Sequence, residues 1–202
     1  MKASFAAADR SRIEKVIREK YAEAARSPEG LFHYPVGRAG LEALTYDHEM
    51  IQRVPDSVLA SYCGVGNPFS LGPLRPGEKV LDIGCGGGVD TFVAAFLLGP
   101  TGQAVGIDAT PEMLERARQN QLKVPLARVA FLPASAEDLP FRDQSFHVVI
   151  SNGVFNLIPD KASALTEVLR VLKPEGRFMI ADQVLTGEMP ENSAARVARW
   201  AG

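Results

Sequence analysis

A run of glycines follows a short apolar stretch and offers a place for close contact between the main chain and a ligand. The stretch Val80–Ile83 ends in Gly84-Cys85-Gly86-Gly87-Gly88, and a helical pattern begins at Val89. Glycines allow the main chain to bend sharply, and free N–H groups at the start of a helix can bind an anion. The spacing is G-x-G-x-G, because Val89 stands where the dinucleotide-binding pattern has its third glycine. We expect a ligand-binding loop of a different kind, with contacts from Gly84, Cys85, Gly86 and Gly88.

Acidic residues on either side of this loop indicate that the ligand carries positive charge. Asp82 precedes the glycines and Asp90 follows them, and both carboxylates would repel a diphosphate. Asp108, after the next apolar stretch, can accept hydrogen bonds from both hydroxyls of a ribose while Thr110 caps the following helix. S-adenosylmethionine combines a ribose with a carboxylate, an ammonium and a sulfonium group. The sequence therefore predicts it as the cofactor, with a plain helix-entry cap as the alternative role of Asp108.

Further contacts to this cofactor are expected at the ends of other strands. In folds of this kind the turn Ala134–Phe141 lies over the adenine, where the main-chain N–H of Ala136 and a neighbouring side chain can read the base edge. A solvated acidic turn is the alternative for this segment. The residues that we expect to contact the cofactor here and at the neighbouring strand ends are Ala109, Ser135, Ala136, Glu137 and Ser151.

Other kinds of catalytic site lack the residues that they need. The three histidines, His33, His48 and His147, lie far apart without metal-ligand spacing, so we expect no metal site. The two cysteines, Cys63 and Cys85, cannot form a disulfide framework and are expected to be reduced thiols. No base stands beside Cys85, which favours a small residue that fills the loop over a nucleophile.

Strands and helices alternate from Lys79 onward. Short apolar runs predict strands at 80–83, 104–107, 129–132, 147–150 and 178–181. Helical patterns lie at 89–98, after Thr110-Pro111, and after Asp160. This order predicts an α/β fold with a doubly wound, mostly parallel sheet and a ligand site at the carboxyl ends of the strands. In the last helix we expect one buried face and an end at Pro174 and Gly176; that face is Leu165, Val168, Leu169 and Leu172.

The residues before Lys79 do not show this alternation of strands and helices. An amphipathic helix is predicted at about 10–26, followed by a stretch rich in Gly and Pro and a short helix around 56–62. We therefore divide the chain into a helical extension, 1–75, that packs over the cofactor site, and an α/β cofactor-binding domain, 76–202.

Composition excludes several partners. The 22 basic and 24 acidic residues give a net charge of −2, so nothing in the charge balance attracts nucleic acid or anionic lipid. The N-terminus lacks the pattern of a signal peptide, and the longest apolar stretch, 92–98, is too short to span a membrane. We expect a cytoplasmic protein that acts on a small molecule.

Several of these segments together resemble the class I S-adenosylmethionine-dependent methyltransferases, and within them the arsenite methyltransferase-like group. The resemblance implies the Rossmann-like fold, cofactor binding and methyl transfer, and it implies that Tyr21 covers the cofactor as a lid; a core position is the alternative. The matching segments are Gly64–Pro68, Val80–Asp90, Gly106–Leu114, Ala136–Phe141, Ile150–Lys161 and Glu167–Pro174.

The same resemblance bears on the methyl acceptor. Arsenite methyltransferases hold arsenic with cysteines, and this chain has Val65 and Gly153 at two of those positions. The third would follow Trp200-Ala201-Gly202, where the chain ends. A soft metalloid needs sulfur ligands, so we expect another small-molecule acceptor, held by Asn152, Gly153 and Phe155.

Alternative functions remain open in the sequence. They are arsenite methylation, cofactor binding without catalysis, and a dinucleotide oxidoreductase. The resemblance also implies a sheet of seven strands, of which five are predicted here, so we expect a domain that is truncated at its C-terminus. The residues 194–200 carry the pattern of a helix that is cut off.

Overall fold

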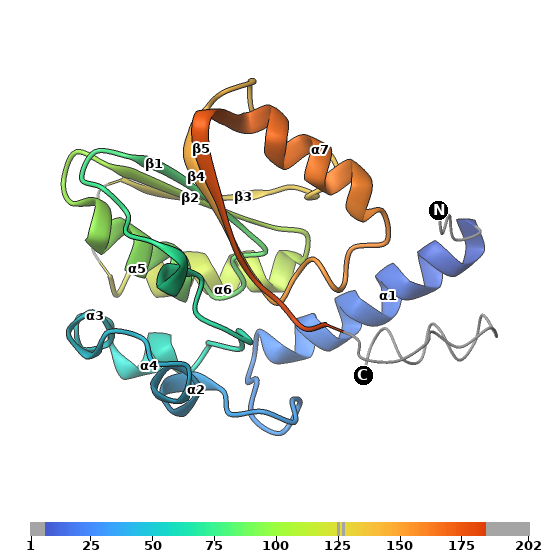
Figure 1. The fold of residues 1–202 in the computed structure, drawn as a ribbon. Helices are drawn as coiled ribbons and strands as arrows, with labels where there is room; N and C mark the ends of the chain where they lie inside the picture. The colour runs from blue at the N-terminus through green and yellow to red at the C-terminus, as the bar shows by residue number, and fades with distance from the viewer. Residues whose placement is uncertain (1–6, 125, 127, 185–202) are drawn as a thin grey trace.

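Five parallel strands form one sheet in the order β3-β2-β1-β4-β5 (Figure 1). The computed structural model describes residues 7–124, 126 and 128–184. Each pair of neighbouring strands runs parallel, which confirms the doubly wound α/β fold. The strands are β1 Lys79–Ile83, β2 Gln103–Asp108, β3 Val129–Pro133, β4 Phe146–Asn152 and β5 Leu172–Ala181.

Helices cover both faces of this sheet (Figure 1). Alternate strand residues point to opposite faces: Val80 packs with α5 (Val89–Leu98) and α6 (Pro111–Gln121), whereas Leu81 packs with α7 (Lys161–Val171). Both residues are fully buried. The near-continuous apolar runs of the strands therefore follow from a sheet that is buried on two sides.

The N-terminal region packs on the α5 and α6 side and shares its core (Figure 1). Leu41, Ile51 and Leu59 belong to the same buried cluster as Phe92 of α5. The sequence predicted the long first helix and a short one near residue 56, but not α2 or α3, which are too short to show a clear period. The elements are α1 Ala7–Ala24, α2 Gly37–Ala43, α3 His48–Gln52, α4 Asp56–Leu59 and a 3₁₀ helix, Pro68–Leu71.

The buried face of α7 differs from the prediction. Leu165 is 42% exposed and Leu169 is 73% exposed, so placing them in the core was wrong. The face that packs on the sheet is Ala164, Val168 and Val171, which also has helical spacing and whose smaller side chains allow the helix to approach the strands.

The predicted end of α7, at Pro174 and Gly176, lies beyond the end of the helix in the structure. The helix ends at Val171, and β5 begins directly at Leu172, so Pro174 and Gly176 lie inside a strand. The pairing of β4 with β5 shifts register between Phe146 and Val148. In this interval β5 has more residues than β4, and a β-bulge accommodates the extra ones. Proline is tolerated at a bulge because it need not donate a hydrogen bond to the neighbouring strand.

The order of the strands fixes where a ligand can bind. β1 pairs with β2 on one side and with β4 on the other, so the direction of winding reverses beside β1 and opens a crevice at its carboxyl end. Within the described residues, no helix is long and apolar enough to cross a membrane. The helix predicted at 194–200 lies outside the described residues.

Candidate functional site

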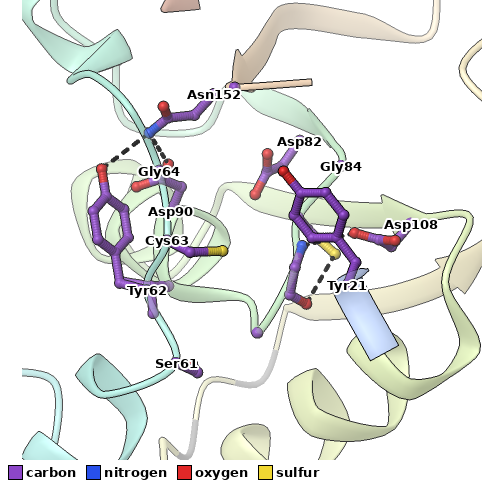
Figure 2. Close-up of a pocket in the computed structure, with 15 residues that line it drawn as sticks. Tyr21, Ser61, Tyr62, Cys63, Gly64, Asp82, Gly84, Asp90, Asp108 and Asn152 are labelled. Carbon is purple, nitrogen blue, oxygen red and sulfur yellow. Dashed lines mark hydrogen bonds between the residues drawn. The ribbon is translucent and has the colours of Figure 1, made fainter. Parts of the chain in front are cut away.

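A pocket lies at the carboxyl ends of β1, β2 and β4 (Figure 2). The glycine loop after β1 forms one wall, and residues 61–64 and Tyr21 from the N-terminal region form the opposite side. The residues that line the pocket are Tyr21, Ser61, Tyr62, Cys63, Gly64, Asp82, Gly84, Cys85, Gly86, Gly87, Val89, Asp90, Asp108, Asn152 and Gly153.

The glycine loop is fixed against β2. The main-chain N–H groups of Gly84 and Cys85 both donate to the carbonyl oxygen of Ile107, at 2.8 and 2.9 Å. Gly84 has a φ of +72°, and a Cβ atom there would collide with the side chain of Val154. Only glycine suits this position, since the conformation and the close approach both exclude a side chain.

Asp108 closes the other end of this loop. One carboxylate oxygen accepts the N–H of Gly86 at 2.9 Å, and the other accepts the N–H of Thr110 at 2.8 Å. Thr110 makes no side-chain cap, so the expectation that Thr110 would leave Asp108 free of the helix entry was wrong. The hydroxyl of Thr110 and the N–H of Ala109 also form hydrogen bonds to this carboxylate, and Asp108 lines the pocket.

Two further carboxylates make the pocket acidic. Asp82 accepts the hydroxyl of Thr91 at 2.6 Å, and Asp90 accepts the hydroxyl of Tyr46 at 2.8 Å. Burial, followed by the charge of Asp90, raises the pKa of Asp82, and burial raises the pKa of Asp90 to about 6. Among the described lining residues none is Lys, Arg or His. A bound cation would therefore be attracted, whereas a diphosphate would be repelled.

Ionisation of Asp90 should lower the stability of the ligand-free protein as the pH rises from about 4 to about 6. The pKa of Asp90 lies near 6 in the folded protein, above its ordinary value of 3.8, so in this window the folded state holds a proton that the unfolded state has lost. Asp90 then costs up to about 3 kcal/mol once it is ionised. Urea unfolding across this pH range measures how the free energy of unfolding changes with pH. This change should be smaller in Asp90→Asn than in the wild type. Equal changes in the two proteins would contradict this role of Asp90.

Asn152 joins the N-terminal region to the sheet (Figure 2). Its side-chain oxygen accepts the N–H groups of Val65 and Gly66 at 2.9 and 3.0 Å. Its side-chain nitrogen donates to Asp90 at 2.9 Å and to the carbonyl of Gly66 at 2.8 Å, and it also lies near the hydroxyl groups of Tyr46 and Tyr62. Asn152 therefore fixes the shape of the pocket as well as lining it.

Several residues that the sequence assigned to the site point elsewhere. The hydroxyl of Ser151 is buried and donates to the carbonyl of Ile83. Phe155 is buried, packs against Phe178 and does not line the pocket. Gly88, the N-cap of α5 with a φ of +87°, is not among the residues that line the pocket.

The turn expected over the adenine lies outside the pocket lining. Glu137 accepts hydrogen bonds from Arg10 and from the N–H of Asp160. Ser135 accepts the N–H of Glu137, and Ala136 packs against the core beneath α7. Ala109 is exposed beside Asp108. The carboxylate of Glu137 is thus already engaged by α1.

Tyr21 and the cysteines complete the pocket. Tyr21 faces the glycine loop in Figure 2, and burial raises its pKa well above the ordinary value. Cys85 packs closely against Gly106, and burial raises the pKa of its thiol. The sequence did not predict Ser61, Tyr62, Cys63 and Gly64 as part of the pocket. The glycines at 64 and 66 were the one signal that the main chain packs closely against other residues there. Within the described residues, no cluster of His, Cys, Asp and Glu is arranged to hold a metal ion.

Comparison with known sequences places this pocket in a family. A family described as a methyltransferase domain matches residues 74–201, which include all five strands and the glycine loop. The chain belongs to this methyltransferase domain family. Together with its solved relatives, the methyltransferase domain implies S-adenosylmethionine as the cofactor, and the acidic pocket without basic side chains fits the two cationic groups of that molecule.

Individual relatives agree with this assignment. An arsenite methyltransferase of Halobacterium salinarum is 36% identical over 91% of this chain and 50% of its own length. A ubiquinone/menaquinone biosynthesis C-methyltransferase of Ectopseudomonas mendocina is 43% identical over 56% of this chain and 45% of its own. The chain therefore spans half or less of the length of these curated relatives.

A solved structure shows the same fold. An arsenic(III) S-adenosylmethionine methyltransferase from Chlamydomonas reinhardtii is 31% identical, with a TM-score of 0.59 over 85% of this chain and 62% of that chain. The class I methyltransferase fold that the sequence predicted is thus confirmed.

Proposed function

We propose that this protein transfers a methyl group from S-adenosylmethionine to a small organic acceptor. The observation that carries the proposal is the pocket at the end of β1, where the carboxylates of Asp82, Asp90 and Asp108 surround a glycine loop and no basic side chain is present among the described lining residues. Such a pocket favours a sulfonium nucleoside over a phosphorylated one.

Each wall of the pocket has a part in holding the cofactor. Asp108, at the end of β2, accepts the ribose hydroxyls, and Asp82 and Asp90 face the ammonium and sulfonium charges. The first turn of α5 is left for the carboxylate, because the N–H groups of Gly84, Cys85 and Gly86 are bonded within the protein. Ala109 and the turn 135–137 lie towards the adenine; since Glu137 is held by Arg10, main-chain groups of this turn are better suited to read the base.

The chain contributes alignment and exclusion of water rather than acid–base chemistry. S-adenosylmethionine supplies a methyl group that the positive sulfur makes electrophilic. Tyr21 covers the pocket from α1, and Asn152 holds residues 65–66 against it. Transfer between a fixed cofactor and an aligned nucleophile requires mainly this positioning.

An organic acceptor is favoured over arsenite by the residues at the acceptor side. Val65 and Gly153, which stand where the related enzymes are expected to carry arsenic-binding cysteines, lie next to each other: a Cβ atom on Gly153 would be 3.3 Å from the Val65 side chain. This position therefore offers no sulfur. Burial raises the pKa of the nearby Cys63 thiol to about 12, so it stays protonated and is a poor ligand for a metalloid.

Calorimetric titration tests the cofactor. S-adenosylmethionine and S-adenosylhomocysteine should bind, and NAD should not, because its diphosphate would face Asp82 and Asp90. Binding of NAD alone would overturn the proposal. Formation of S-adenosylhomocysteine, measured with arsenite and with panels of phenols, thiols and amines, then identifies the acceptor; turnover confined to arsenite would reject the organic acceptor.

A further inference from the structure

A second cavity adjoins the cofactor pocket. Tyr21 and Gly153 line both cavities, so the two meet at these residues. The second cavity is formed by α1, by residues 31–34 and by the segment after β4. Gly153 places no side chain between the two cavities, and the side chain of Val65 packs beside it and also lines the second cavity. A molecule in the second cavity would therefore lie beside the cofactor.

Aromatic rings form one side of this second cavity. The ring centroids of Phe32 and Tyr34 are 5.2 Å apart with an interplanar angle of 36°, and those of Tyr21 and Phe32 are 6.1 Å apart at 53°. All three rings are half-buried, and Ile17 and Leu31 add aliphatic surface. Partly exposed rings of this kind stack on, or meet edge-on, a flat aromatic molecule.

The ionisable side chains that line the second cavity differ from those of the first, and the nearest carboxylate, Asp182, accepts the N–H groups of Asn156 and Gln183. The described residues that line the second cavity include Lys20 and His33 but no Asp or Glu. The ammonium group of Lys20 lies 5.0 Å from the centroid of the Phe32 ring, so a positive charge stands at the aromatic wall. The acidic pocket suits a cationic cofactor, and the second cavity suits an anion.

We infer that the second cavity is the acceptor site and that it binds a planar aromatic molecule with an anionic substituent. The aromatic part lies against Phe32 and Tyr34, and the negative charge lies towards Lys20. This inference rests on the proposed function, because it names the class of acceptor for the same reaction. The nucleophilic atom of the acceptor would then face the cofactor pocket past Tyr21 and Gly153.

Calorimetry with three matched probes tests this site. The full chain is first saturated with S-adenosylhomocysteine, which keeps the probes out of the cofactor pocket, and is then titrated with 4-hydroxybenzoate, 4-hydroxybenzamide and 4-hydroxycyclohexanecarboxylate. The aromatic acid should bind at least about 10-fold more tightly than the uncharged amide or the saturated acid. Equal binding of the amide or of the saturated acid, or no binding of the aromatic acid, would overturn the inference.

Variants then locate the bound molecule. Lys20→Met keeps the aliphatic stem over Phe32 but removes the charge, and it should abolish the preference for the acid over the amide. Phe32→Leu should weaken both aromatic probes. Lys15→Met is the matched control, because Lys15 lies on the same helix with its side chain 74% exposed and outside the cavity; an equal effect in this control would overturn the assignment. If S-adenosylhomocysteine binds but the aromatic acid does not, this inference fails alone; if neither binds, the proposed function fails as well.

Discussion

Replacing Asp108 by alanine should weaken the binding of S-adenosylmethionine about 10- to 100-fold. A buried donor that loses its charged acceptor costs about 1–3 kcal/mol, and each factor of ten in affinity is about 1.4 kcal/mol. Two effects combine in this variant, because Asp108 also holds Gly86 and Thr110 through their N–H groups. Isothermal titration calorimetry on the purified protein measures the change.

Asp108→Asn separates these two effects. The amide keeps one oxygen, so it can hold one end of the loop but cannot accept from both hydroxyls of a ribose. The affinity of Asp108→Asn for S-adenosylmethionine should lie between those of the wild type and Asp108→Ala. Asp143→Ala serves as the control, because the side chain of Asp143 is 72% exposed and pairs with Arg170 away from the pocket. Unchanged affinity in Asp108→Ala would remove the ribose role from this residue.

The sequence allowed the half of the site that follows β1 and β2 to be predicted. Val80–Ile83 and Ala104–Ile107 are buried on both faces of the sheet, so their apolar runs are nearly continuous, with Asp82 as the one charged residue, and their ends are easy to place. The glycine loop and Asp108 come directly after these ends. Chain order alone therefore brings them together at the crevice, because parallel neighbours share one carboxyl edge.

The other half of the site depends on tertiary contacts that no local pattern shows. Ser61 and Tyr62 follow a helix of four residues and reach the pocket only because the N-terminal region packs on α5. Leu169 resembles a core residue in sequence, but Ala164 allows α7 to lie closer to the sheet on a different face. Asn152 was expected to contact the acceptor, and nothing in its neighbours indicated that it would bind residues 65–66, which precede it by more than eighty positions.

Replacing Asn152 by leucine should destabilise the protein by about 4 kcal/mol. Leucine has nearly the same size but no polar atoms, so the N–H groups of Val65 and Gly66 and the carboxylate of Asp90 each lose a partner. Each N–H group that is left without a partner costs about 1–3 kcal/mol, and Asp90, which keeps Tyr46 as a donor, adds a smaller loss. The melting temperature should fall by about 10 °C for a chain of this size. Urea unfolding and thermal scans measure the two quantities.

A nearby asparagine provides the control for this variant. Asn67→Leu removes a side chain that accepts the N–H of Phe69 at the start of the 3₁₀ helix, and the loss of such a cap costs about 1 kcal/mol. Equal losses in the two variants would show that Asn152 is an ordinary polar residue and does not join the two regions.

The part of this loss that comes from Asp90 can be measured separately. In Asn152→Leu, Asp90 keeps only Tyr46 as a side-chain donor, so a buried carboxylate is left poorly compensated. Adding Asp90→Asn to that variant replaces the charge by a neutral amide and should recover stability at pH 7. In the wild type, Asp90→Asn instead replaces the charged acceptor of the Asn152 amide by a weaker neutral one. The two effects of the same substitution should therefore differ by at least about 1 kcal/mol in a double-mutant cycle. Additive effects would mean that Asn152 and Asp90 are not coupled, and the bond between them would then contribute nothing to joining residues 65–66 to the cofactor pocket.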